Sequence, residues 1–210
     1  MTTTRSLLIF GLGLLVLALG AGAWFLTGSG PRGVATSGSV VTSGQAKVGG
    51  PFALIDQHGA TRSDADFRGR HMLIYFGFTF CPDICPTSLM AMTRALDQLE
   101  ESAPALAERI VPIFITVDPE RDTVEANKLY AEHFHPRLIA LTGSEAQIAS
   151  AAKAYRVYYR KAESSSASDY LVDHSSFVYL MDGDGNYVTH FAHNASAEEM
   201  AEKLVGYVGS

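Results

Sequence analysis

Cysteine and basic residues are both scarce in this chain. Two cysteines in 210 residues exclude a disulfide-dense scaffold and a four-thiolate site for zinc or an iron–sulfur cluster. The formal net charge is −6 and no run of Lys and Arg occurs, which argues against binding to nucleic acid. Charged residues make up 18% of the chain and hydrophobic residues 47%, a balance that excludes a wholly disordered protein.

A long uncharged segment lies near the N-terminus. Residues 7–26 carry no charged side chain, and a helix of about 20 apolar residues crosses a membrane. Because Arg5 precedes this segment, we expect residues 1–6 to be cytoplasmic and residues 7–26 to be a single transmembrane anchor. A cleaved signal peptide is the alternative, since residues 21–23 match a cleavage pattern. Both interpretations place the rest of the chain on the periplasmic side of an inner membrane, where disulfides can form.

The remainder of the chain divides into a tether and one folded domain. Residues 27–47 are rich in Gly, Ser and Thr and show no hydrophobic period, which predicts a flexible tether. Residues 48–210 carry apolar runs and helix-capping patterns. These predict strands at 52–56, 71–79, 110–117, 175–181 and 187–191, a helix at 87–99, and helices beginning near residues 122, 144 and 196. Alternating strands and helices predict an α/β fold with parallel strand pairs, and the final hairpin and helix are typical of a thioredoxin-like domain.

Both cysteines lie in one short motif, Phe-Cys81-Pro-Asp-Ile-Cys85-Pro86, between a buried strand and a helix. Because Pro86 lacks an N–H, we expect it to be the first residue of the helix, with Cys85 at the N-cap. Both thiols would then lie near the positive end of the helix dipole, which favours the thiolate that binds metal or attacks a disulfide. A plain disulfide is the alternative, although a loop this short gains little stability from one.

A histidine that could complete a metal site occurs much later, in Val172-Asp173-His174-Ser175. If the strand that follows lay parallel beside residues 71–79, His174 would approach the cysteines. Two thiolates and one imidazole suit Cu(I) and also accommodate Cu(II) or zinc, so the number of ligands does not identify the metal. Taken alone, a histidine at a loop–strand junction is more often a structural or surface residue.

Two further polar groups have ordinary structural interpretations. Residues 118–122 follow a buried strand, and we expect Asp122 to cap the next helix and Arg121 to pair with a neighbouring acid. His133 and His135 lie at a predicted helix end, where histidine complements the helix dipole without a metal.

Together these motifs resemble the Sco/SenC family of membrane-tethered, thioredoxin-like copper proteins. The resemblance rests on the anchor, on Gly77–Pro86, on Val117-Asp-Pro-Glu-Arg-Asp-Thr123 and on Val172–Ser175, and it extends over about residues 48–208. It implies a thioredoxin-like domain of the peroxiredoxin-like variety. It also implies that Cys81, Cys85 and His174 bind one copper ion, as Cu(I) or Cu(II).

The resemblance further implies a metallochaperone that delivers copper to the dinuclear copper site of cytochrome c oxidase subunit II. Another copper chaperone or a thiol reductant is a further expected partner. Asp173, next to the histidine, is a candidate for orienting its imidazole.

Two enzymatic alternatives use the same cysteines. A membrane-anchored thiol–disulfide oxidoreductase would reduce the cysteines of a partner such as subunit II, and it would not need His174. A thiol peroxidase would need a Thr or Ser three residues before the reactive cysteine and a Pro four residues earlier still. Phe78 and Ile74 occupy these positions, which argues against a peroxidase.

Overall fold

The computed structural model describes residues 47–162 and 170–209. The predicted cytoplasmic segment, anchor and nearly all of the tether lie outside these residues. Among the described helices, none is both long enough and apolar enough to cross a membrane.

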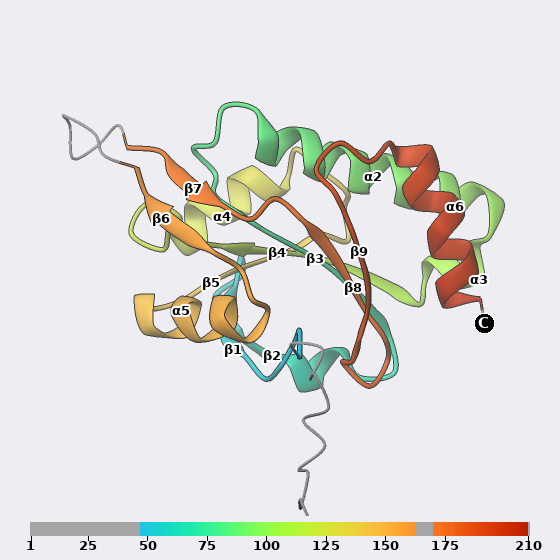
Figure 1. Cartoon of the computed structure of the whole chain (residues 1–210), viewed down its shortest axis with the longest axis horizontal. Coiled ribbons are helices and arrows are strands. Elements are labelled where there is room, and N and C mark those ends of the chain that lie inside the picture. The colour runs from blue at the N-terminus through green and yellow to red at the C-terminus, as the bar shows by residue number, and fades with distance from the viewer. Residues whose placement is uncertain (1–46, 163–169, 210) are drawn as a thin grey trace, which may run out of the picture. The chain divides into compact units, whose positions relative to one another are not determined.

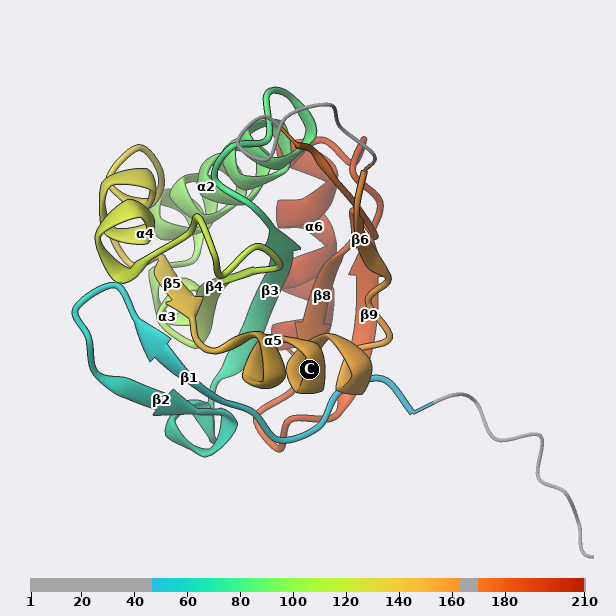
Figure 2. The same cartoon turned by 90° about the vertical axis from the view of Figure 1, so that its left-hand side faces the viewer.

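Seven strands form one twisted sheet in the order β2-β1-β5-β4-β3-β8-β9, and two more form a separate hairpin, β6-β7 (Figure 2). The strands are β1 (Ala53–Asp56), β2 (Thr61–Ser63), β3 (His71–Gly77), β4 (Ile110–Thr116), β5 (Ile139–Thr142), β6 (Tyr159–Lys161), β7 (Val172–His174), β8 (Val178–Met181) and β9 (Tyr187–Phe191). The helices are the 3-10 turn η1 (Asp64–Phe67), α2 (Ile84–Ser102), α3 (Pro104–Ala107), α4 (Val124–Ala131), α5 (Glu145–Ala154) and α6 (Ala197–Val208). The predicted α/β class is therefore confirmed.

The core lies on both faces of the central strands. Every residue of β3, β4 and β8 is buried, as expected for strands covered on both sides. Helices α2 and α6 pack side by side over one face, and α5 lies on the other (Figure 1). Strands β3, β4 and β5 are parallel, which confirms the parallel pairs predicted from the alternation of elements.

The strand after His174 lies beside β3, but the expected parallel pairing is wrong. Strand β8 runs antiparallel to β3, with Val178 opposite Tyr75. In an antiparallel pair, the start of one strand meets the end of the other. The chain just before β8 therefore lies at the carboxyl end of β3, where the cysteine motif begins.

Helix α2 begins earlier in the chain than we predicted from the position of Pro86. Asp83 is the N-cap residue and Ile84 the first helical residue, so Cys85 lies within the first turn instead of at the N-cap. A proline is tolerated at Pro86 because the first backbone N–H groups of a helix have no carbonyl partner within the helix. Cys85 is helical although the residue before a proline is biased away from the helical region.

The predicted cap at Asp122 is also wrong. Thr123 is the N-cap of α4, and its hydroxyl accepts a hydrogen bond from the backbone N–H of Ala126. Asp122 is fully buried and binds other partners, described below. By contrast, the predicted caps at Ser144 and Ser196 are confirmed, and Ser144 forms a reciprocal capping box with Gln147.

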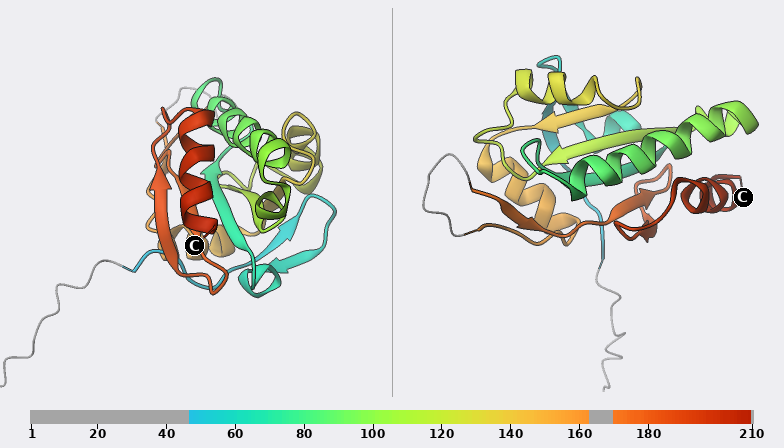
Figure 3. Two further views of the ribbon diagram at one scale, coloured as in Figure 1. Left: turned by 90° about the vertical axis from the view of Figure 1, so that its right-hand side faces the viewer. Right: turned by 90° about the horizontal axis from the view of Figure 1, so that it is seen from above.

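The short hairpin β6-β7 was not predicted. Its strands read Tyr-Arg-Lys and Val-Asp-His, too short and too polar to show a strand period. Within it, Tyr159 lies opposite His174. The hairpin projects at the end of the main sheet where α2 begins, as Figures 1 and 3 show.

Candidate metal centre

Three separate elements bring two thiols and an imidazole together. Cys81 follows β3, Cys85 lies in the first turn of α2, and His174 ends β7. Their ligand atoms all lie within 4.8 Å of one another. The shortest approach, 3.3 Å, joins Cys85 Sγ to His174 Nε2. The structure thus places together the three residues that the resemblance assigned to copper.

The imidazole is held in one orientation and one tautomer. His174 Nδ1 lies 3.1 Å from the backbone carbonyl oxygen of Ser175, which can only accept a hydrogen bond. The proton is therefore on Nδ1, and the lone pair of Nε2 faces the thiols. The rings of Tyr75 and Phe78 meet the imidazole edge-on, with centroids 6.1 and 5.8 Å away. Nε2 is thus presented as a ligand atom.

The orienting role expected for Asp173 is wrong. Its side chain is 59% exposed and lies 3.8 Å from the guanidinium of Arg160. Successive side chains of a strand point to opposite faces, so the neighbour of an inward histidine points outward. The Ser175 carbonyl makes the contact that the sequence assigned to Asp173.

The two thiols differ in burial and in acidity. Cys85 is fully buried, whereas Cys81 is half-buried, and both are free cysteines. The pKa of Cys81 falls to about 3, chiefly because the Cys85 thiol hydrogen-bonds to it. The pKa of Cys85 rises, because it shares its proton with Cys81 and because it is buried. Without metal, the pair therefore holds one thiolate and one thiol.

A glycine makes room for the buried thiol. A Cβ atom at Gly77 would lie 2.8 Å from Cys85 Sγ and 2.8 Å from the ring of Tyr75. Contacts this short do not occur for real Cβ atoms, so the backbone of β3 can approach the thiol only without a side chain. No pattern in the sequence indicates this role of Gly77, because it depends on the packing of α2 against β3.

A pocket of about 290 Å³ opens over the site. Cys81 and His174 line it, together with apolar side chains that include Pro82, Ile84 and Leu171. Both residues are therefore reachable from solvent, whereas Cys85 is fully buried and does not line the pocket.

The buried carboxylate of Asp122 holds the start of the cysteine loop through hydrogen bonds. Asp122 accepts hydrogen bonds from the backbone N–H of Thr79 at 3.0 Å and from its hydroxyl at 2.6 Å. The hydroxyl of Thr116 donates to the same carboxylate. Burial raises the pKa of Asp122, and these hydrogen bonds oppose that rise. Asp122 thus joins the ends of β3 and β4, a role that its helix-cap pattern concealed.

A second cluster, His135 with Asp97 and Glu100, is not arranged for a metal. His135 Nδ1 accepts the backbone N–H of Arg137 at 3.1 Å, so the ring proton lies on Nε2. Nε2 points toward Glu100 at 3.3 Å, and that carboxylate also pairs with Arg137 at 2.8 Å. A protonated ring nitrogen cannot coordinate a cation, so the cluster is an Arg137–Glu100 ion pair beside a buried histidine.

The chain resembles Sco proteins in sequence and in structure. The SCO1/SenC family model matches residues 40–209. The human mitochondrial protein SCO2 homolog is 48% identical over 161 residues, a match that spans 76% of this chain and 60% of the human protein. The crystal structure of Arabidopsis thaliana ScoI with copper bound is 42% identical, with a TM-score of 0.71 over 77% of this chain and 98% of that one. Bradyrhizobium japonicum ScoI with copper bound is also 42% identical, with a TM-score of 0.69 over 76% and 99% of the two chains. The chain therefore belongs to the SCO1/SenC family.

Proposed function

We propose that this chain binds one copper ion through Cys81, Cys85 and His174 and delivers it to the dinuclear copper site of cytochrome c oxidase. The observation that carries this proposal is the convergence of two sulfur atoms and one unprotonated imidazole nitrogen within 4.8 Å. Three ligand atoms this close together can be bound by one metal ion.

The donor set favours copper. Two thiolates suit Cu(I), and the imidazole accommodates Cu(II), whereas the hard oxygen ligands that magnesium and calcium prefer are missing from this trio. Zinc also accepts two cysteines and one histidine, so ligand type alone leaves it open. The copper bound by the related plant and bacterial ScoI structures favours copper over zinc.

The unequal exposure of the ligands suits transfer by ligand exchange. Cys81 and His174 line the open pocket, so an incoming thiolate replaces these ligands first. Cys85 is buried and releases the ion last. Cu(I) is held tightly by thiolates, so transfer requires competing soft ligands on the acceptor. The cysteines of cytochrome c oxidase subunit II provide such ligands, and the Sco family is described as one of cytochrome c oxidase assembly proteins.

Membrane attachment belongs to the same proposal. The apolar segment 7–26 anchors the chain, and residues 27–47 tether the domain on the extracytoplasmic side. A flexible tether of about 20 residues spans roughly 25 Å on average. Confining donor and acceptor to one membrane raises their effective concentration.

Thiol–disulfide exchange is the second candidate function. It is favoured by one observation: a half-buried thiolate, Cys81, lies beside a second free cysteine that can complete a disulfide. This function requires both cysteines and predicts that His174 can be replaced without loss.

Copper loading separates the two functions. The reduced full-length chain is loaded anaerobically with Cu(I) and then, in a second sample, with Cu(II), beside His174→Ala and Cys81→Ser. His193→Ala, at an exposed position, is the matched control. We expect one copper per chain in wild type and control, and loss of the sulfur-to-Cu(II) absorption bands in both site variants. Loaded chains are then mixed with reduced subunit II.

Transfer of copper to subunit II from wild type, but not from His174→Ala, is the result expected of a metallochaperone. The contrary result comes from cells that lack this protein. If His174→Ala restores cytochrome c oxidase activity there as well as wild type does, while both cysteines stay essential, the chain is an oxidoreductase instead.

A further inference from the structure

The hairpin that carries His174 is not part of the main sheet. Strands β6 and β7 pair only with each other in the described sheets, with three residues in each strand. An isolated two-stranded hairpin is marginally stable in water. Its position against the cysteine loop therefore depends on side-chain contacts with the rest of the domain.

Arg121 lies between the cysteine loop and the hairpin. Its guanidinium carbon is 4.7 Å from the ring centre of Phe80, which directly precedes Cys81. It is 3.7 Å from the ring centre of Tyr170, which lies two residues before β7. Arginine stacks on aromatic faces because its charge is delocalised over a flat group. One side chain thus contacts both halves of the site.

Buried partners fix Arg121 and Tyr170 in place. Arg121 pairs with Asp118 at 2.5 Å, and the Asp118 side chain is fully buried. The hydroxyl of Tyr170 donates to the other oxygen of Asp118 at 2.7 Å. We call these four residues, Phe80, Asp118, Arg121 and Tyr170, the arginine cluster. Every member except Phe80 is mostly buried, so the cluster is an ordered part of the fold.

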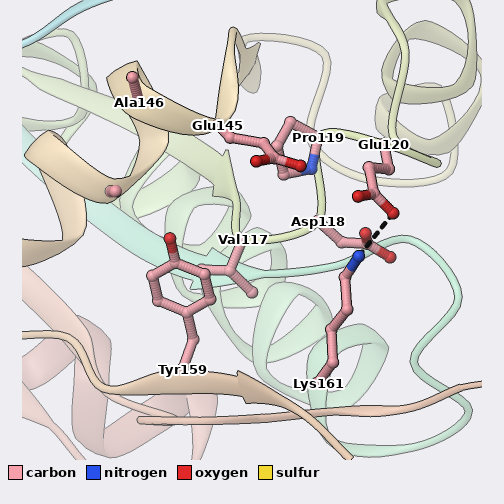
Figure 4. Close-up of a pocket in the computed structure, with 9 residues that line it drawn as sticks. Val117, Asp118, Pro119, Glu120, Glu145, Ala146, Tyr159 and Lys161 are labelled. Carbon is pink, nitrogen blue, oxygen red and sulfur yellow. Dashed lines mark hydrogen bonds and ion pairs between the residues drawn. The ribbon is translucent and has the colours of Figure 1, made fainter.

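Strand β6 packs on the core through Tyr159 alone, while Arg160 and Lys161 are exposed. A pocket of about 520 Å³ lies beside β6, between Tyr159 and Lys161 on one side and the start of α5 on the other (Figure 4). Lys161 crosses its rim to pair with Glu120 at 2.5 Å, and both side chains are about half exposed. An exposed ion pair contributes little stability. The hairpin is therefore held by the packing of Val172 and Tyr159 on the core and, on the side of the cysteine loop, by the arginine cluster.

We propose that Arg121 is a positioning residue of the metal centre: by stacking between Phe80 and Tyr170, it holds the histidine hairpin against the cysteine loop and keeps His174 within reach of the two thiols. This inference rests on the proposed function only in taking the metal to be copper. It assigns Arg121 no contact with the ion. Its effect on the ion passes through His174 alone.

The test exploits the difference between arginine and lysine. Arg121→Lys keeps a positive charge beside Asp118 but cannot stack as a flat group on two rings. Tyr170→Leu removes the ring on the hairpin side. Arg137→Lys is the matched control, because Arg137 pairs with Glu100 in a network remote from the metal centre. Thermal unfolding of each metal-free variant reports any general loss of stability.

The first measurement is the copper affinity of the full chain in a cycle with His174→Ala. We expect Arg121→Lys and Tyr170→Leu to weaken copper binding by about 10-fold. This is the lower end of the range of losses in metal affinity seen when a residue that supports a ligand is removed. In the His174→Ala background the same changes should have no effect on affinity. Equal losses in both backgrounds, or a loss in Arg137→Lys as large as in Arg121→Lys, would overturn the inference.

The second measurement needs no metal. NMR of the reduced, metal-free chain reports the edge-on contact between His174 and Phe78, whose ring centres are 5.8 Å apart. We expect this contact to weaken in Arg121→Lys and persist in Arg137→Lys. If wild type bound no copper, the proposed function would fail, but this result would still decide the inference. A contact of unchanged strength in Arg121→Lys would refute the positioning role.

Discussion

No side chain fits between Gly77 and the sulfur of Cys85, since a Cβ atom at Gly77 would lie 2.8 Å from Sγ. Strand β3 therefore contributes to the site through the absence of a side chain as well as through the loop that follows it. The thiol is held by backbone on one side and by the first turn of α2 on the other.

We expect Gly77→Ala to weaken copper binding by displacing Cys85 and to destabilise the fold. Overpacking a buried site costs about 1–3 kcal/mol of unfolding free energy. Chemical denaturation and copper titration measure the two effects. Gly206→Ala is the control, because Gly206 lies in α6 with open space around it. That change should leave copper binding intact and stabilise the fold by up to about 1 kcal/mol. Wild-type copper affinity in Gly77→Ala would show that the close approach is unimportant.

Cys81 should react with iodoacetamide well before Cys85 in the reduced, metal-free chain. Cys81 is half-buried and its pKa lies at about 3, whereas Cys85 is fully buried. An ordinary thiol with a pKa of about 8.5 reacts roughly tenfold more slowly for each pH unit below that value. Because Cys81 is already a thiolate, we expect its rate to change less than about twofold between pH 8 and 6. Mass spectrometry of the two alkylated positions measures the rates. A steep fall in rate with pH would contradict the shared-proton arrangement.

Asp173→Ala should leave copper binding unchanged within about twofold, because this side chain is exposed and paired with Arg160. The comparison is Ser175→Pro, which keeps the carbonyl that accepts from His174 Nδ1 but removes the Ser175 N–H that donates to the Tyr158 carbonyl, and it should weaken copper binding. Copper titration measures both. A loss of copper affinity in Asp173→Ala as large as that in His174→Ala would show that the Asp173 carboxylate does orient the imidazole.

Asp56 should stabilise the fold at neutral pH and lose this effect in acid. Burial raises the pKa of this carboxyl, but hydrogen bonds from Arg62 and from the backbone N–H groups of Ala60 and His58 outweigh burial and lower it. Its stabilisation is therefore complete above the ordinary value of 3.8 and is lost as pH falls through the lower folded-state pKa.

We expect Asp56→Asn to cost about 1–3 kcal/mol of unfolding free energy at pH 7, the range for hydrogen bonds to a charged group. The difference from wild type should shrink at pH 3 and below. Urea denaturation at several pH values measures it, with the exposed Asp184→Asn as control. A difference that stays constant down to pH 2 would contradict the assignment.

The position of the cysteines was predictable because local patterns determine it. A buried apolar run before Cys81 and a helical period after Cys85 place the motif between a strand and a helix, and the structure has that arrangement. The start of the helix was less predictable. A proline fits any position in the first turn of a helix, so Pro86 does not identify the residue at which α2 begins.

The position of His174 was not predictable from periodicity. It depends on the antiparallel pairing of β8 with β3 and on a hairpin of three-residue strands. The resemblance to Sco proteins supplied it instead. The prediction that Asp122 caps a helix was wrong for a related reason. Its spacing to Glu125 matches a capping pattern, but its carboxylate binds Thr79 and Thr116, which are neighbours only in the folded chain.

The most direct test of the central claim is X-ray absorption spectroscopy at the copper edge of the Cu(I)-loaded full-length chain. We expect two sulfur ligands and one nitrogen ligand per copper in wild type, and two sulfur ligands without the imidazole in His174→Ala. A spectrum of wild type with sulfur ligands alone, unchanged by His174→Ala, would contradict the three-residue centre.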